Sequence, residues 1–303
     1  MSAGVAAVRT SGLGKRYGSR WALRDCALEI PAGSVTALVG PNGAGKTTLL
    51  HMVIGLVEPT NGDVEVFGRS PRRDAREVLP RLGFVAQDHP LHRNLTIAEM
   101  LRYGRKLNPS WNQQLAASRI ERLGLSQKQK IGRLSGGQQA QVALTLALAK
   151  QPQLLVLDEP VASLDPLARR EFLNAVMEVV VDDGLTVVLS SHIVAELERV
   201  CDHLVTLAEG ATQLSGPIPE IVARHRLLTG PRGDVASVAR VHDVIRESHT
   251  ERQTTLLVRA NGHVYDSCWE QHEVDLEEIV LAYLGYRPGN GASTIPAREA
   301  VRA

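Results

Sequence analysis

Residues 40–48 have the residue types and the spacing of a phosphate-binding loop, G-x-x-x-x-G-K-[ST]. In order they are Gly40, Pro41, Asn42, Gly43, Ala44, Gly45, Lys46, Thr47 and Thr48. The glycines allow consecutive backbone N–H groups to turn towards phosphate oxygens, and a following helix adds the positive end of its dipole. In such a loop the lysine reaches the β- and γ-phosphates, and the next hydroxyl, here that of Thr47, ligates Mg²⁺. The loop therefore predicts a site for a nucleoside triphosphate with Mg²⁺.

The loop lies between an apolar run at residues 35–39 and a second apolar segment at 49–54, which indicates a strand, a loop and a helix. That is the context in which the motif binds phosphate. Two further apolar runs, at residues 154–157 and 185–189, also lack alternation. Short runs of this kind are typical of strands buried on both faces of a parallel sheet. The expected fold class is α/β, with a mostly parallel sheet.

Polar residues follow the second and third of these runs. Asp158 and Glu159 come directly after residues 154–157, and Ser190, Ser191 and His192 come after residues 185–189. In open α/β sheets, ligands bind outside the carboxyl ends of the strands. Three separate segments of the chain are therefore expected to bring their polar side chains to one edge of the sheet.

The long segment at residues 88–152 has helical periodicity and is expected to be inserted into the sheet domain. Its first helix is expected to begin near Asn94, a residue that caps helices well. Residues 142–149 alternate apolar positions in a way that a strand also would. Their alanine content, their continuity with Gly137 and the stop at Pro152 favour a helix instead.

The pentapeptide Leu134-Ser135-Gly136-Gly137-Gln138 precedes that helix. Together with the phosphate loop it resembles the nucleotide-binding domains of ATP-binding cassette (ABC) proteins, and the resemblance covers about residues 5–215. It implies a P-loop NTPase cassette with an antiparallel β edge and an inserted helical subdomain. It also implies, in chain order, an adenine-stacking Tyr17, a glutamine-loop Gln87 at the Mg²⁺ and the attacking water, a Walker B Asp158, a D-loop Asp165 and a switch His192.

The chemistry of phosphoryl transfer explains these residue types. Asp158 is expected to hold Mg²⁺ through water, because Mg²⁺ takes few direct protein ligands. Glu159 is expected to act as general base on the attacking water, and His192 to hold the γ-phosphate. Residues 135–138 offer a hydroxyl and backbone N–H groups at a helix N-terminus, which makes a second anion site. The family arrangement implied is a head-to-tail dimer of two copies, with ATP between the loop of one and the signature of the other.

The boundaries expected from the sequence are a nucleotide-binding domain at residues 1–220, a small C-terminal α+β extension at 221–287 and a disordered tail at 288–303. Asn261-Gly262 is a hairpin signal between the apolar stretches 254–260 and 263–269. Asp275 is expected to cap a helix that presents one apolar face and ends near Gly285. That helix resembles a C-terminal segment of single-cassette ATPases in ABC-2 type exporters. A folded cap on the cassette and a regulatory role are both open readings of the extension.

Composition narrows the function classes. The formal net charge of +1 provides no global field that would draw the chain to nucleic acid or to anionic lipid, and the aromatic fraction is 4%. Three scattered cysteines favour reduced thiols over a disulfide framework or a zinc site. No apolar run reaches the roughly 18 residues of a membrane-spanning helix, and the start of the chain lacks the pattern of a secretory signal. A cytoplasmic chain without a nucleic-acid partner is expected.

The resemblance and the composition together favour the ATP-hydrolysing subunit of a membrane exporter, bound to the inner face of the membrane through a separate permease. The alternative is an ABC ATPase that acts on ribosomes or nucleic acid. Such proteins resemble this chain less, because they carry two cassettes or long heptad arrays. A kinase or GTPase with a phosphate loop is excluded by the signature at residues 135–138.

Overall fold

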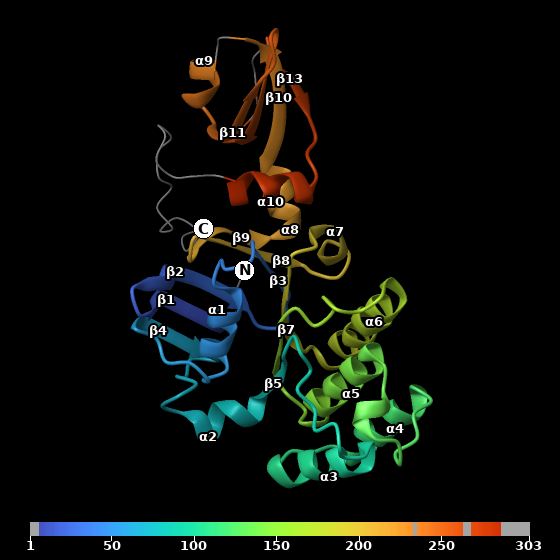
Figure 1. Cartoon of the computed structure of the whole chain (residues 1–303). Helices are drawn as coiled ribbons and strands as arrows, with labels where there is room; N and C mark the ends of the chain where they lie inside the picture. The colour runs from blue at the N-terminus through green and yellow to red at the C-terminus, as the bar shows by residue number, and fades with distance from the viewer. Residues whose placement is uncertain (1–5, 233–234, 263–267, 286–303) are drawn as a thin grey trace.

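The structure is a computed structural model that describes residues 6–232, 235–262 and 268–285. Its centre is a six-stranded sheet in the order β5-β6-β7-β3-β8-β9. The strands are β3 (Val35–Val39), β5 (Leu82–Val85), β6 (Leu154–Leu157), β7 (Thr186–Ser191), β8 (His203–Ala208) and β9 (Ala211–Pro217). In the sheet, the five strands β5, β6, β7, β3 and β8 all run parallel to one another. The edge strand β9 runs antiparallel to β8. The predicted mostly parallel sheet is confirmed (Figure 1).

The two faces of the central sheet are covered by different layers. On one side lie α1 (Lys46–Val53) and a three-stranded antiparallel sheet formed by β2 (Arg20–Pro31), β1 (Ala6–Tyr17) and β4 (Asn61–Val66). On the other lie α5 (Gly136–Ala149) and α6 (Pro166–Asp183). Within β3 the side chains alternate between these layers, with Ala37 in one core and Leu38 in the other. Burial on both faces explains why the strand sequences are continuously apolar.

The segment between β5 and β6 forms the helical arm (residues 88–152), as predicted. It contains α3 (Ile97–Leu107), α4 (Gln113–Arg122), the short 3₁₀ helix η2 (Ile131–Arg133) and α5. The arm has its own apolar cluster, which includes Ile97, Leu101, Ile120 and Val142. α5 also contributes Leu144 to the core of the central sheet. This shared helix therefore joins the arm to the sheet, and the expectation of a helix over residues 142–149 is confirmed.

The start of α3 differs from the expectation at Asn94. Thr96 is the N-cap: its Oγ1 accepts a hydrogen bond from the Glu99 N–H at 3.2 Å, while the Glu99 carboxylate accepts one from the Thr96 N–H at 2.8 Å. This capping box satisfies two backbone donors at once. Asn94 lies two residues too early to provide it, so the prediction of the helix start was wrong by two residues.

The remaining elements connect these layers. α2 (Ala75–Val78) and η1 (Leu79–Arg81) precede β5, α7 (Val194–Leu197) follows β7, and α8 (Ile218–Arg224) follows β9. The C-terminal part contains β10 (His225–Pro231), α9 (Val235–Ala239), β11 (Asp243–His249), β12 (Gln253–Arg259), β13 (Glu270–His272) and α10 (Leu276–Gly285). Its strands form an antiparallel sheet in the order β11-β12-β10-β13. The predicted small α+β extension is confirmed as a fold.

The pairing inside this sheet corrects the hairpin predicted at Asn261-Gly262. Both edges of β12 are already occupied, one by β11 and the other by β10. The hairpin of the sheet instead joins β11 to β12 through residues 250–252, where the Thr250 and Gln253 backbones are hydrogen-bonded. Residues 263–267, the start of the predicted partner strand, lie outside the described residues. The local turn signal was outweighed by strand pairings with residues distant in the sequence.

α10 connects the C-terminal part to the cassette. The Asp275 carboxylate accepts a hydrogen bond from the Glu278 N–H at 2.7 Å, which confirms the predicted cap. Ile279, Val280 and Tyr283 are buried in the same core as the central sheet. The Tyr283 hydroxyl also contacts Nε2 of the buried His225 at 3.0 Å. The extension therefore packs directly on the cassette.

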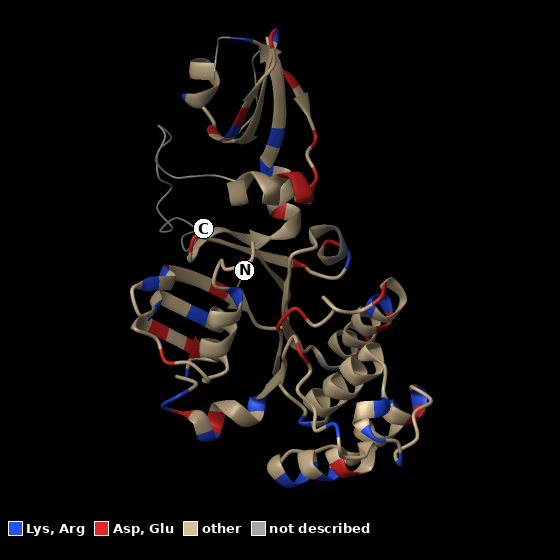
Figure 2. Cartoon of the chain, in the orientation of Figure 1, with Lys and Arg blue, Asp and Glu red and all other residues tan. Residues whose placement is uncertain are grey.

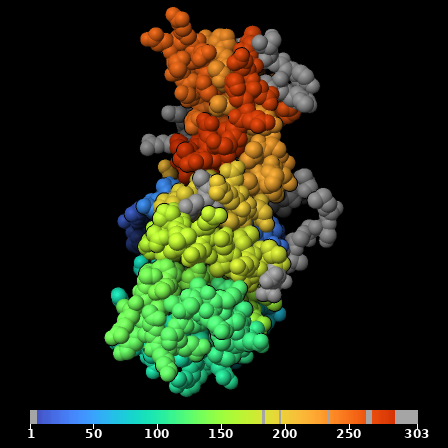
Figure 3. Space-filling view, turned by 90° about the vertical axis from the view of Figure 1, so that its right-hand side faces the viewer, coloured from blue at the N-terminus to red at the C-terminus, as the bar shows by residue number. Residues whose placement is uncertain are grey.

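The predicted division between residues 220 and 221 falls inside α8 and stays a prediction, and the predicted tail at 288–303 lies outside the described residues. Figure 3 shows the C-terminal part at one end of the molecule and the helical arm at the other. Within the described ranges, no helix has the combination of length and apolarity that crossing a bilayer requires.

Candidate nucleotide site

The phosphate loop connects β3 to α1, as the sequence predicted. Gly45 has φ +103°, a left-handed conformation that side chains rarely adopt, and a Cβ there would lie 2.5 Å from the Ala22 carbonyl oxygen. At Gly40 a Cβ would lie 2.4 Å from the Leu207 carbonyl oxygen. Both glycines are therefore required by close backbone contacts, and Gly45 also by its conformation. Thr47 is exposed in the first turn of α1.

Lys46 is 5% exposed, so its ammonium group needs partners within the protein. Its Nζ donates to the backbone oxygens of Gly40 at 2.7 Å and Pro41 at 3.3 Å. It also forms an ion pair with Oε1 of Glu159, 3.3 Å away. The loop carbonyls thus hold the lysine at the loop, and its charge faces the carboxylate that follows β6.

Glu159 joins all three segments that were expected to meet. Its Oε2 lies 3.5 Å from Nδ1 of His192, and its Oε1 contacts Lys46. The Glu159 backbone has φ +43°, a left-handed conformation that is uncommon for residues other than glycine. The site therefore brings together a cation from the loop, a carboxylate from the end of β6 and an imidazole from the end of β7.

Asp158 is held by a residue to which the sequence analysis gave no role. It is 3% exposed, and its Oδ1 accepts a hydrogen bond from the Ser190 hydroxyl at 2.8 Å. The same hydroxyl accepts one from the Glu159 N–H at 2.8 Å. Ser190 therefore positions both acidic residues at once. The available signal was its place one residue past an apolar strand run, but only the pairing of Leu157 with Leu189 shows that β6 and β7 are neighbours.

Within the described residues, no hydrogen bond or ion pair joins Gln87, Tyr17 or Asp165 to this group of side chains. Gln87 is exposed in the turn that follows β5. The Tyr17 ring is 51% exposed at the end of β1, with Nζ of Lys15 5.3 Å from its centroid. Asp165 caps α6, where its Oδ1 accepts hydrogen bonds from the Leu167 and Ala168 N–H groups at 3.0 Å.

The signature lies at the start of α5, within the helical arm. Ser135 is the N-cap, and its hydroxyl accepts a hydrogen bond from the Gln138 N–H at 3.2 Å, while the Gln138 side chain accepts one from the Ser135 N–H. Gly136 and Gly137 occupy the first helical positions between them. No hydrogen bond or ion pair found in the described part of the chain joins residues 135–138 to the loop at 40–48. The signature begins a helix of the arm, whereas the loop lies between β3 and α1.

The first prediction concerns Ser190. Replacing it with alanine removes the donor to Asp158 and leaves the Glu159 N–H without its acceptor. We expect Ser190→Ala to lower the free energy of unfolding by about 1–3 kcal/mol and to lower the ATPase rate per folded molecule. Ser34→Ala is the control, because Ser34 donates a similar hydrogen bond to the Pro31 carbonyl at the opposite end of β3. If Ser190→Ala and Ser34→Ala lowered the ATPase rate equally, Ser190 would have no specific role in positioning the acidic residues.

Comparisons with known proteins identify the relatives of this chain. A family model described as "ABC transporter" matches residues 23–162. The bacitracin transport ATP-binding protein BcrA of Bacillus licheniformis is 31% identical over 221 residues, which cover 72% of this chain and 72% of that protein. The phosphonates import ATP-binding protein PhnC 1 of Natronomonas pharaonis is 36% identical, with coverages of 68% and 92%. The Nod factor export ATP-binding protein I of Rhizobium johnstonii is 35% identical, with coverages of 67% and 67%.

Solved structures show the same relationship. A structure titled "Structure of ATP binding subunit of ABC transporter" superimposes with a TM-score of 0.65 at 27% identity, over 72% of this chain and 92% of that one. The residues matched by the family model, 23–162, include the phosphate loop and the helical arm. The protein belongs to the ATP-binding cassette family: it is an ATPase, the ATP-binding subunit that powers a membrane transporter.

Proposed function

We propose that Lys46, Glu159 and His192 form the reaction centre for ATP hydrolysis. The observation that supports this most directly is that Glu159 lies 3.3 Å from Lys46 and 3.5 Å from His192 at the sheet edge. Lys46 would bind the β- and γ-phosphates of ATP, and a phosphate oxygen would replace Glu159 as its anionic partner. Glu159 would then be available to accept the proton of the attacking water, and His192 would donate to the γ-phosphate.

The oxygen donors predicted for the site suit Mg²⁺. A carboxylate from Asp158, a hydroxyl from Thr47 and an amide oxygen from Gln87 are hard oxygen ligands, which this ion prefers. Mg²⁺ would neutralise charge that develops on the phosphates. Ser190 holds the Asp158 carboxylate in place by its hydrogen bond to Oδ1, and that carboxylate would bind the ion or its water shell.

The remaining predicted contacts concern the rest of the nucleotide. The exposed ring of Tyr17 offers a surface on which adenine can stack. Among the other loop residues, Gly40, Asn42, Gly43, Ala44, Gly45 and Thr48 would contribute backbone or hydroxyl donors to the phosphates. Pro41 has no N–H to donate and would only shape the loop. We assign residues 135–138 and Asp165 to a nucleotide bound by a second copy of the chain.

A second copy is needed because one chain presents its two anion sites separately. The phosphate loop follows β3, whereas Ser135 begins α5 in the arm. A head-to-tail dimer would place the signature of each copy over the loop of the other, so that each ATP contacts both. Two sites would then close together, in a symmetric isologous arrangement.

We further propose that the chain serves an exporter whose permease is a separate polypeptide on the membrane, with the ATPase on its cytoplasmic side. Identity to import and export relatives is similar in the cassette, at 36% and 35%, so the cassette does not separate the directions. Support for export comes from the C-terminal helix at residues 276–285, which resembles that of ABC-2 type ATPases. The alternative, action on ribosomes or nucleic acid, predicts co-purification with ribosomes.

Transport direction can be tested in the source cells. Deletion of the gene should increase sensitivity to at least one compound in a panel of toxic compounds, because an exporter lowers the internal concentration. Wild-type protein should restore resistance, and Glu159→Gln should not. Increased resistance of the deletion strain would instead indicate uptake and would contradict export.

Catalysis is tested at Glu159. We expect Glu159→Gln to retain ATP binding but to lower steady-state hydrolysis by at least about a hundredfold, because it removes the proton acceptor and none of the phosphate donors. The ATP-bound dimer should then accumulate on size-exclusion chromatography. Glu171→Gln, at an exposed position in α6, is the matched control and should hydrolyse ATP normally. If Glu159→Gln retained most of the steady-state rate of ATP hydrolysis, Glu159 would not be the general base.

The shared site is tested by mixing two inactive variants. Ser135→Arg should leave ATP binding to the monomer intact and prevent closure of the dimer, whereas Lys46→Ala should lose ATP binding. In a mixed dimer both changes fall on one composite site and the other site is intact, so some hydrolysis should return. Ser135→Asn preserves a helix cap without the long side chain and serves as the control. Loss of tight ATP binding in monomeric Ser135→Arg would show that the signature acts within one chain.

A further inference from the structure

The net charge of the whole chain conceals a strong local asymmetry. Residues 88–152, the helical arm, contain ten lysine and arginine residues against three aspartate and glutamate residues, a net charge of +7. Residues 220–285 contain seven against eleven, a net charge of −4. Figure 2 shows basic positions along α3 at the end of the molecule farthest from the C-terminal sheet. The expectation that no field attracts anionic surfaces therefore holds for the average charge but not for this end.

The outer surface of α3 combines cations with apolar side chains. Its inner side is fixed by Ile97, Met100 and Leu101, which are buried in the arm core. Arg102, Tyr103, Arg105, Lys106 and Leu107 are all exposed, and together they form what we call the α3 face. Arg102 and Lys106 are four residues apart, as are Tyr103 and Leu107, so a basic row and an apolar row run side by side along the helix.

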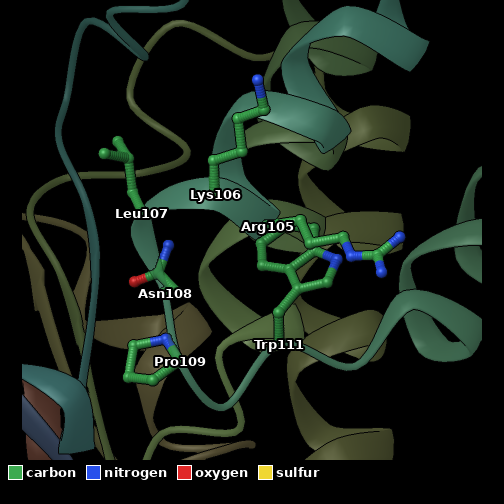
Figure 4. A pocket seen from close by; sticks show the side chains of 6 residues that line it. All are labelled: Arg105, Lys106, Leu107, Asn108, Pro109 and Trp111. Carbon is green, nitrogen blue, oxygen red and sulfur yellow. The ribbon is translucent and has the colours of Figure 1, made fainter.

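The end of this face is held in a defined conformation. Trp111 packs so closely against Gly104 that a Cβ there would lie 2.7 Å from the indole. The Asn108 amide donates to the Gly104 carbonyl at 2.7 Å and ends the helix. Figure 4 shows Arg105 next to Trp111, while Lys106 and Leu107 point away from it. Leu107 is 62% exposed and Tyr103 48%, so the two apolar side chains stand in solvent beside the cations of the same helix.

Further exposed cations lie in the segments beside α3: Arg93, Lys128, Lys130 and Arg133. Arg93 lies in the segment before α3, and the other three lie after α4. Backbone hydrogen bonds join the two segments, from Ile97 N–H to the Gln129 oxygen and from Ile131 N–H to the Leu95 oxygen. In the described part of the chain, neither these four cations nor those of the α3 face have a carboxylate oxygen within 4.0 Å. Arg102 and Lys130 lie near enough to the Glu99 carboxylate to help lower its pKa, after the hydrogen bonds from Thr96. None of the seven cations forms a direct ion pair in the described residues, so most of their charge is available to an external anionic surface.

We propose that the α3 face docks on the anionic headgroups of a lipid bilayer. Basic residues near such a surface are attracted electrostatically, and adjacent tyrosine and leucine side chains enter the interfacial layer. A nucleic acid would use the cations but gain little from Leu107. The acidic C-terminal end would be repelled by the same surface, so the charge asymmetry would also orient the subunit. The proposal rests on the family's transport role only for the presence of a membrane.

The test measures co-sedimentation of the full chain with two kinds of vesicle, phosphatidylcholine alone and phosphatidylcholine with roughly one third phosphatidylglycerol. We expect binding to the anionic vesicles, decreasing steeply with salt, and none to the neutral ones. The triple variant Arg102→Gln, Arg105→Gln, Lys106→Gln should bind roughly ten- to a hundredfold more weakly. Tyr103→Ser with Leu107→Ser should weaken binding while leaving its salt dependence unchanged.

The matched control removes three exposed arginines elsewhere. Arg69, Arg72 and Arg73 each form an ion pair, with Glu77, Glu58 and Asp63 respectively. Their triple replacement by glutamine makes the same change in net charge and should leave vesicle binding nearly unchanged. ATP affinity, measured without vesicles, verifies that each variant is folded and tests the nucleotide site separately.

Three outcomes would overturn the proposal: equal binding of wild type and the α3 variant, equal loss in both triple variants, or no binding to anionic vesicles at low salt. Displacement of the vesicles by a single-stranded RNA oligonucleotide that binds the α3 face more tightly would assign the face to nucleic acid instead.

Discussion

The parallel pairing of β6, β7 and β3 is the constraint on which the site depends. Leu157 pairs with Leu189, and Val39 pairs with Ser191, so the three strands end at nearly the same level. In a parallel sheet, evenly spaced hydrogen bonds hold this register along the whole strand. The phosphate loop, the acidic pair and His192 follow these ends directly, which is why residues more than a hundred positions apart come within hydrogen-bonding distance.

Charge balance at that edge shows why the acidic and basic groups occur together. A buried ammonium group such as that of Lys46 is costly unless carbonyl and carboxylate oxygens surround it. The loop supplies two carbonyls and Glu159 the carboxylate. Asp158 is satisfied separately by Ser190. Each charged group therefore has a defined partner at the site where ATP phosphates would add further negative charge.

The apolar cores group the segments of the chain in a way that their order in the sequence does not show. The C-terminal helix α10 lies in the same core as the central sheet, whereas α3 and α4 pack in a cluster of their own, shared with the sheet mainly through α5. The extension is thus attached to the cassette by apolar packing, because Ile279, Val280 and Tyr283 are buried in the core of the central sheet. The arm, which carries the signature and the α3 face, depends on a single helix for much of its attachment.

Much of this could be predicted from sequence, because the strongest signals are local. The phosphate loop, the continuous apolar strands, the alanine-rich α5 and the Asp275 cap each depend on residues within a few positions of one another. The role of Ser190, the Thr96 cap in place of Asn94, and the pairing of β12 with β10 and β11 were not accessible in that way. A hydroxyl group can form hydrogen bonds with several different groups, and a turn dipeptide is compatible with several strand pairings. Which of these forms depends on the strand or helix that the rest of the fold places beside it. The sequence by itself determined which residues could bind phosphate and where helices and strands form. Only the tertiary structure decided which of those residues meet, because strand order and register are set by the packing of the whole core.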